Sequence, residues 1–236
     1  MKIKGLEQSL LNARAALLQQ QGSEGYWSGQ LSSSALSTAT AVQALCLADN
    51  DDSRDLIEGG LKWLVLNQNP DGGWGDTTNS FSNLSTTLLA WSALSFSGKF
   101  SFSRTRLKAA EQSARDWIVN HVGSLDPERI ADSATARYGK DKTFSAPILM
   151  MCAIAGKLGN GSLAWRRVAP LPFELAVIPP SFFGIVRLPV VSYALPALIA
   201  IGYARFHHLP PLSPFRLIRE KAWVRASRVL EQVQPQ

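Results

Sequence analysis

Charged residues are scarce in this sequence, and this scarcity limits the kind of surface that the chain can have. Only 18% of its 236 residues are Asp, Glu, Lys or Arg, whereas about a quarter is usual for a soluble domain. The hydrophobic share is 46%, which is enough for one sizeable core. The chain therefore either buries much of its surface or faces another apolar body, such as a second domain or a membrane.

Cysteine and histidine are also rare, which argues against a disulfide scaffold and against a metal site. The two cysteines, Cys46 and Cys152, lie in apolar stretches, so we interpret them as core residues in a reducing compartment. Of the three histidines, His207 and His208 are adjacent and His121 is distant, which does not make a ligand set. A phosphate-binding loop and a nucleophile paired with a base are missing too. We therefore expect no metal and no cofactor.

Long uncharged runs are missing as well, and this excludes a membrane-spanning helix. The two candidates, residues 175–186 and 188–203, are shorter than the ~18–20 residues that a span needs, and both contain proline. The N-terminus does not resemble a signal peptide, because Glu7, Asn12 and Arg14 interrupt any apolar stretch. The sequence thus predicts a cytoplasmic protein that could lie on a membrane without crossing it.

Positive charge is concentrated near the C-terminus. The formal net charge is +6, and residues 205–228 contribute most of it. The basic residues of this window are Arg205, Arg216, Arg219, Lys221, Arg225 and Arg228, against the single acid Glu220. One interpretation is a basic helix whose apolar side packs on the domain. Contact with anionic lipid headgroups is an alternative, whereas no recognition motif suggests nucleic acid.

A repeated unit organises the chain. It consists of an apolar helix, a glutamine and a turn that contains glycine and tryptophan. Copies occur at residues 15–27 and 59–76, and their tryptophans, Trp27 and Trp74, are 47 residues apart. A degenerate copy with Trp117 covers residues 109–123, and a further one starts at residue 226. We call this unit the Gln–Trp repeat.

A second kind of helix alternates with the Gln–Trp repeat. It is rich in small residues and nearly free of charge, which indicates burial on all sides. The sequence places it at residues 38–47, 86–96, 144–156 and 191–202. Alternation of buried and amphipathic helices predicts an all-α fold, a double-layered α/α barrel (α-toroid) that is incomplete. We expect the barrel domain to cover residues 1–204, and residues 205–236 to form a basic linker helix and the start of a truncated repeat.

Two stretches resemble the squalene–hopene cyclase family, the class II triterpene cyclases. They are Gln68–Gly75, which reads QNPDGGWG, and the stretch from Trp165 (WRRVAPLPFEL) to residues 188–194 (LPVVSYA). The resemblance implies two α-barrel domains that enclose a linear isoprenoid such as squalene, proton-initiated polyene cyclisation in triterpenoid or hopanoid biosynthesis, and peripheral membrane association. The family's acid is an Asp-x-Asp-Asp motif in the other barrel. The string at residues 49–52 (DNDD) matches it literally, but we interpret that string as a solvated turn.

The resemblance also assigns roles to individual residues. It implies that Trp165 lines the cavity, and Phe173, Tyr193 and residues 182–183 are further candidates for substrate contact, with ordinary core packing as the alternative. The repeat residues are expected to be structural, and they are Gln68, Asp71, Gly73 and Trp74. No catalytic residue is expected in this chain, which by itself would be inactive.

Two other functions remain open from the sequence. One is a barrel like that of the protein prenyltransferases, which carry a similar Asp-Gly-Gly turn and would need zinc. The other is a non-catalytic interaction module. Leu89 and Ala146 favour the latter, because they stand where the resemblance leads one to expect polar residues of hopene cyclases.

Overall fold

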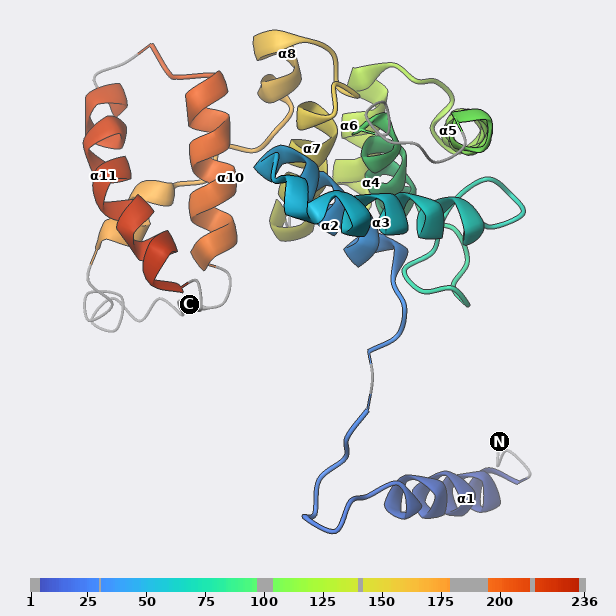
Figure 1. The fold of residues 1–236 in the computed structure, drawn as a ribbon. Coiled ribbons are helices and arrows are strands. Elements are labelled where there is room, and N and C mark those ends of the chain that lie inside the picture. The colour runs from blue at the N-terminus through green and yellow to red at the C-terminus, as the bar shows by residue number, and fades with distance from the viewer. Residues whose placement is uncertain are drawn as a thin grey trace. The chain divides into compact units, whose positions relative to one another are not determined.

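The structure, a computed structural model, describes residues 5–29, 31–96, 104–139, 142–178, 195–212 and 215–233 (Figure 1). It divides into two compact units, unit 1 (Met1–Ser33) and unit 2 (Ser34–Gln236). Every regular element of the described residues is a helix. The elements are α1 (Leu6–Gln19), α2 (Ala35–Ala48), η1 (Asp51–Ser53), α3 (Arg54–Leu66), α4 (Leu84–Leu94), α5 (Arg104–Val122), α6 (Pro127–Ala136), α7 (Lys142–Ile154), α8 (Gly161–Arg166), η3 (Phe173–Val177), α10 (Leu195–His208) and α11 (Phe215–Val233).

The inner layer of unit 2 is a row of four helices. Helix α2 packs against α4, α4 against α7, and α7 against α10. Helix α4 is the most enclosed of them, because every residue from Ser85 to Leu94 is buried. These four helices overlap the four stretches that the sequence predicts to be buried on all sides, and residues 191–194 of the last stretch lie outside the described residues. The prediction holds for α4, but α2 and α10 bury only part of their surface; in α2, for example, Leu36 and Leu47 are exposed.

The outer helices of unit 2 follow the inner ones in alternation. Helix α3 packs on α2, α5 on α4, and α6 on α7. Each buries one stripe only, as in α3, where Ile57, Leu61 and Leu64 are buried at helical spacing while Lys62 faces solvent. The predicted all-α, double-layered α/α toroid is therefore confirmed.

Side chains at the helix starts determine where the helices begin. Ser34 accepts a hydrogen bond from the backbone N–H of Ser37 at the start of α2, and Asn83 accepts one from Thr86 at the start of α4. Asp126 does the same for the first turn of α6, and Pro127 follows it at the first helical position. These caps satisfy N–H groups that have no partner inside the helix.

The turn after α3 shows how a Gln–Trp repeat is built. Trp74 is fully buried, and its indole Nε1 donates to the carbonyl of Leu64, 2.9 Å away. The amide of Gln68 donates to the carbonyl of Gly72 at 2.8 Å and to that of Ala110 in α5 at 2.9 Å. Because Ala110 lies within α5, Gln68 links the turn to the next outer helix.

Asp71 links the second and third repeats. Its carboxylate accepts hydrogen bonds from Ser82 Oγ at 2.7 Å, from the Gly73 N–H at 3.0 Å and from Trp117 Nε1 at 3.0 Å. Burial acts to raise the pKa of Asp71, but these three bonds lower it below its ordinary value. The tryptophan of the degenerate copy, which also stacks on His121, has thus lost its own turn and serves the turn of the preceding repeat.

Unit 1 contains the same turn with the same internal hydrogen bonds. Trp27 Nε1 donates to the carbonyl of Leu17, ten residues earlier, and the amide of Gln21 donates to the carbonyl of Gly25. Each donor and acceptor lies 47 residues before its counterpart in unit 2. Within unit 1, however, Trp27 is 47% exposed and no residue of α1 is buried.

Helix α10 continues through residue 204 to His208, and α11 packs on α10 and η3. The division of the chain after residue 204 stays a prediction. The basic window is not a single helix: Arg205 lies in the last turn of α10, and the remaining basic residues lie in α11, which packs one side on α10 and η3 and buries Ala226. In the described part of the chain, no helix is long and apolar enough to cross a membrane.

Candidate functional site

No fully buried side chain among the described residues of unit 2 is charged. At the edge of the interior between the layers, the Lys157 ammonium lies 4.1 Å from the ring centroid of the buried Trp91 and pairs with Glu111 at 2.9 Å. Among the described residues, the buried polar residues are Gln43, Ser85, Thr86, Thr87, Ser92 and Ser145, and none of them carries a charge. Leu89 and Ala146 are both buried in this interior. At these two positions, where the resemblance leads one to expect polar side chains, the interior surface is therefore apolar.

Most of the buried polar side chains form a hydrogen bond with a neighbouring backbone or side-chain group. The Gln43 amide of α2 donates to the Leu89 carbonyl of α4 at 3.3 Å, and Ser85 shares a 2.7 Å hydrogen bond with the Tyr138 hydroxyl. Ser92 donates to the thiol of Cys152 at 3.5 Å. Burial raises the pKa of the Cys152 thiol to about 11, so this cysteine is an inert core residue rather than a nucleophile.

Trp165 lies on α8, in the proline-rich stretch that has no Gln–Trp turn. Pro170 and Pro172 follow it and keep the helical segments short. The Trp165 ring is buried and stacks on His208 of α10, with centroids 4.2 Å apart and planes 10° apart. Burial, and secondarily the neighbouring His207, lower the pKa of His208, which favours a neutral imidazole in the stack.

Phe173 lies at the start of η3 and is fully buried. Its ring meets the edge of Tyr203 at a centroid distance of 5.8 Å, and the guanidinium of Arg219 lies 5.3 Å from its centroid. Arg219 also donates from Nε and Nη2 to Glu174 Oε1, at 3.2 and 3.1 Å. A cation over an aromatic face and an ion pair thus fasten η3 to α11.

The structure brings Trp165 and Phe173 to the same helix, α10, but into different clusters. Trp165 belongs to the main core between the layers, whereas Phe173 belongs to a smaller core with Ile199, Phe206 and Ala226. Both are packing residues here, and their contact with a substrate stays a prediction. Tyr193 and residues 182–183 lie outside the described residues.

A groove of about 420 Å³ lies between α6 and α8. Its lining consists of Glu128, Ala131, Asp132, Thr135, Leu163, Arg166 and Arg167. Carboxylates and guanidinium groups on its walls do not suit a hydrocarbon, because desolvating a charge costs far more than an apolar ligand returns. Sequence reasoning did not find this groove, since its residues come from two separate segments.

The string at residues 49–52 forms an exposed turn between α2 and α3. Asp49 adopts a left-handed conformation with φ 48° at the end of α2, and the Asn50 side chain accepts a hydrogen bond from the Asp52 N–H. Asp51 and Asp52 are exposed. An acid that protonates an alkene must be kept neutral by a buried setting, and this turn offers none.

In the described ranges, no group of three or more His, Cys, Asp or Glu side chains is arranged to hold a metal ion. The zinc site of a prenyltransferase-like barrel therefore has no counterpart among these residues.

Comparison with known proteins agrees with the helical architecture and the repeats. The sequence model of the squalene–hopene cyclase N-terminal domain matches residues 10–131. Alpha-onocerin synthase LCD from Lycopodium clavatum is 27% identical over 201 residues, which cover 81% of this chain and 23% of that protein. The chain thus spans about a quarter of the length of this relative, and no solved structure matches it. The matched region extends from α1 into α6 and makes up half of the chain, and the chain belongs to the squalene–hopene cyclase N-terminal domain family.

Proposed function

We propose that this chain is the N-terminal barrel of a squalene–hopene-cyclase-like protein and forms one wall of an isoprenoid-binding cavity for proton-initiated polyene cyclisation. The observation that carries the proposal is the inner layer, which combines the family's helical repeat with an interior free of charge. A hydrocarbon chain binds best where no polar group has to give up water. The relative from Lycopodium clavatum, an onocerin synthase, is a triterpene-forming enzyme by its name and supports the same class of substrate.

In this proposal the chain contributes the dry surroundings of the reaction, and a second α-barrel contributes the acid. Carbocations formed during cyclisation have no counter-ion, so they are stabilised by aromatic faces in a cavity that excludes water. Trp165, Phe173 and Tyr193 are the aromatic residues that we assign to such contacts. The chain alone would bind the isoprenoid without converting it, and it needs no metal or cofactor.

A linear isoprenoid dissolves in a bilayer rather than in water, so the proposed protein works at a membrane surface. We place it in the cytoplasm as a peripheral membrane protein. Triterpenoid biosynthesis is the corresponding process.

The test uses photolabelling with an isoprenoid. A benzophenone-bearing C30 isoprenoid is irradiated with the chain in detergent micelles, and the labelled peptides are identified by mass spectrometry. We expect saturable labelling that squalene suppresses and that a short alkane does not. The longer gene product that carries this chain is then incubated with squalene, and cyclic C30 products are sought by gas chromatography. Labelling that squalene does not suppress would contradict the proposed cavity.

A non-catalytic interaction module is the second candidate, because Leu89 and Ala146 are buried apolar residues at positions where the family resemblance led us to expect polar ones. If the chain is such a module, neither squalene nor its analogue should bind saturably, and the longer protein should form no cyclic product. The family match favours the cyclase-like barrel over the prenyltransferase-like one.

A further inference from the structure

Helix α11 has one side that is firmly packed. Trp223 stacks on Tyr203 of α10 with centroids 3.3 Å apart, and Ala226 is fully buried between α10 and η3. On the same side, Arg219 is held by Glu174. Since these contacts fix the rotation of α11 about its axis, they also fix which residues point away from unit 2.

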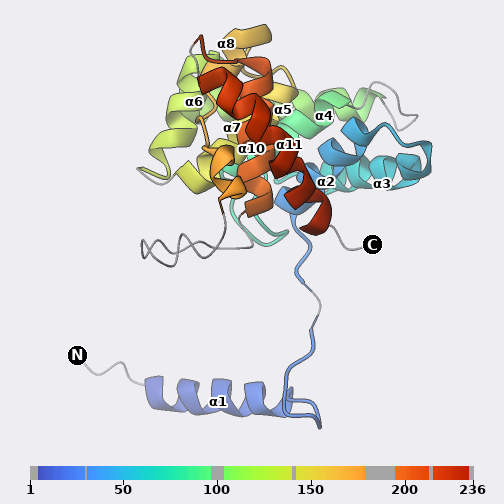
Figure 2. The same cartoon turned by 90° about the vertical axis from the view of Figure 1, so that its left-hand side faces the viewer.

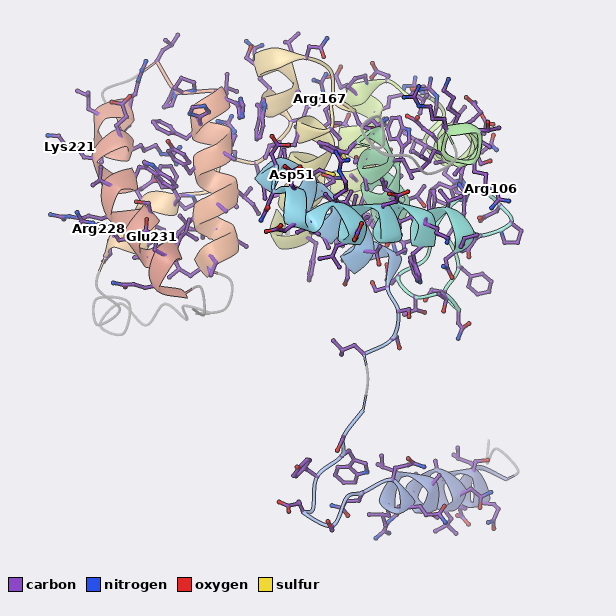
Figure 3. All side chains as sticks on the ribbon, in the orientation of Figure 1. Asp51, Arg106, Arg167, Lys221, Arg228 and Glu231 are labelled. Atoms are coloured by element: carbon purple, nitrogen blue, oxygen red, sulfur yellow. The ribbon has the colours of Figure 1, made fainter. Side chains whose placement is uncertain are left out.

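The opposite side of α11 alternates apolar and basic residues. Leu217, Lys221, Val224 and Arg228 follow one another at helical spacing and form a single stripe, with Arg225 beside it. Leu217 is 64% exposed and Val224 is 56% exposed, and the three basic residues are exposed as well. Figure 3 shows Lys221 and Arg228 extending from the side of α11 that faces away from α10.

Among the described residues, no acidic side chain neutralises the basic residues of this stripe. In the part of the chain that the structure describes, no acidic side chain forms an ion pair with Lys221, Arg225 or Arg228. Two other basic residues of α11 do have acidic partners: Arg216 pairs with Glu220 at 2.8 Å, and Arg219 pairs with Glu174 at 3.0 Å. In Figure 1 α11 lies at the left edge of unit 2, and in Figure 2, where that side faces the viewer, it lies in front of α10.

The need for a soluble outer surface explains exposed basic residues, but it does not explain the exposed apolar residues between them. Helix α5 is an outer helix of the same length, and the exposed basic residues of its first two turns, Arg104, Arg106 and Lys108, have no exposed large apolar residue among them. Further along α5, Arg115 is exposed and Val119 is 38% exposed. On α11, by contrast, Phe215 and Ile218 at the start of the helix are exposed in addition to the apolar residues of the stripe. Exposed apolar side chains between cations are unfavourable in water. They are favourable at an interface that offers both apolar and anionic groups.

We propose that the outer face of α11, defined by Leu217, Lys221, Val224, Arg225 and Arg228, lies in the headgroup region of an anionic lipid bilayer. The helix axis would run parallel to the bilayer, with Leu217 and Val224 reaching toward the acyl chains and the cations among the lipid phosphates. This inference rests on the proposed function in one respect: an isoprenoid-binding protein meets its ligand in a membrane.

The expected strength follows from the number of cations. A lysine or arginine near an anionic surface contributes about fivefold to partitioning, so removing three cations costs about a hundredfold. Binding is also expected to weaken with salt, because the Debye length shortens from about 30 Å at 0.01 M to about 8 Å at 0.15 M.

The experiment measures flotation of the chain with vesicles that contain no isoprenoid. Phosphatidylcholine vesicles with and without phosphatidylserine are compared. The triple variant Lys221→Gln, Arg225→Gln, Arg228→Gln should lose about a hundredfold in partition coefficient on the anionic vesicles. A control that removes the same net charge from α5, at residues 104, 106 and 108, should stay within about threefold of the unaltered chain. Circular dichroism verifies that both variants fold.

A second variant tests the apolar part of the stripe. Leu217→Ser with Val224→Ser retains every cation and should still lower binding to anionic vesicles about tenfold or more, since two buried apolar side chains are lost. Equal losses in the α5 and α11 charge variants, or equal binding of the chain to neutral and anionic vesicles, would overturn the proposal. So would sedimentation data in which the α11 variants convert a dimer to a monomer without any change in lipid binding, because the face would then bind a second copy of the chain.

The membrane-binding face of α11 and the isoprenoid cavity are tested independently, so either can be refuted while the other stands. Photolabelling in micelles reports on the isoprenoid cavity and involves no anionic lipid, whereas the vesicles contain no isoprenoid. Normal photolabelling with no flotation would overturn the α11 surface alone. Normal flotation with no squalene-suppressible labelling would leave the α11 surface supported and overturn the cavity.

Discussion

Trp74 and Trp27 permit a direct comparison of one motif in two surroundings. Both indoles donate to a carbonyl ten residues earlier, but Trp74 is fully buried and Trp27 is 47% exposed. We therefore predict that Trp74→Ala strongly destabilises unit 2, and that Trp27→Ala leaves its main unfolding transition nearly unchanged.

The magnitude follows from burial and hydrogen bonding. Replacing a buried tryptophan with alanine costs about 3–5 kcal/mol. The Leu64 carbonyl also loses its indole partner, which adds about 1 kcal/mol. For a domain of this size, each kcal/mol lowers Tm by about 2–4 °C, so Trp74→Ala should lower Tm by about 10–20 °C. A change at an exposed site amounts to about 0.5 kcal/mol, and Trp27→Ala should shift Tm by less than about 2 °C.

Thermal unfolding followed by far-UV circular dichroism measures both shifts. Trp74→Phe serves as a milder variant, because it retains an aromatic ring but removes the indole N–H, and it should cost about 1–3 kcal/mol. Shifts of the same size for the two alanine variants would refute the reasoning, since burial would then not distinguish the two copies of the motif.

Three further predictions concern single residues. Gly72 has φ +90°, and a Cβ at this position would lie 2.6 Å from the backbone of α5. Gly25 has a similar φ of +83° but open space around it. Gly72→Ala should therefore lower the free energy of unfolding, measured by urea titration, clearly more than Gly25→Ala does. The hydrogen bond from Thr86 lowers the pKa of Asp76 from 3.8, so its stabilisation is complete above that pH and is lost as the pH falls through the lowered value; Asp76→Asn should flatten the acid side of a stability profile measured by urea unfolding at stepped pH. Burial raises the pKa of Cys152 to about 11, so this thiol should remain unlabelled by a maleimide at neutral pH until urea unfolds the chain, and rapid labelling of the native protein would contradict its buried position.

The helical layers could be predicted because their signal is local. Helix α4 was expected at residues 86–96 and is found at Leu84–Leu94, since an uncharged stretch bounded by an asparagine cap has few other solutions. Helix α6 was missed although its start carries a readable signal: Asp126 as cap followed by Pro127. Ten residues with only three buried ones give too weak a periodicity to stand out.

The contacts of the candidate site could not be predicted, because they join segments that are distant in sequence. The sequence around Trp117 contains no pattern that predicts the hydrogen bond from its indole to Asp71, 46 residues earlier. Likewise, the stacking of Trp165 on His208 depends on which inner helix follows α7 in the row. The resemblance supplied a family and residue types, whereas the neighbours of each ring are set by the packing of the toroid.

The hydrogen bonds inside each Gln–Trp turn span only four and ten residues. Contacts of such short separation close quickly, because little chain entropy is lost in forming them. A turn of this kind can therefore form on the ribosome as soon as its tryptophan has left the exit tunnel, before the next inner helix has been synthesised. Each repeat would then be folded before the following repeat packs against it, so the repeats would assemble in the order of translation. The hydrogen bond from Gln68 to the carbonyl of Ala110, 42 residues later in the sequence, would form only once α5 has been synthesised.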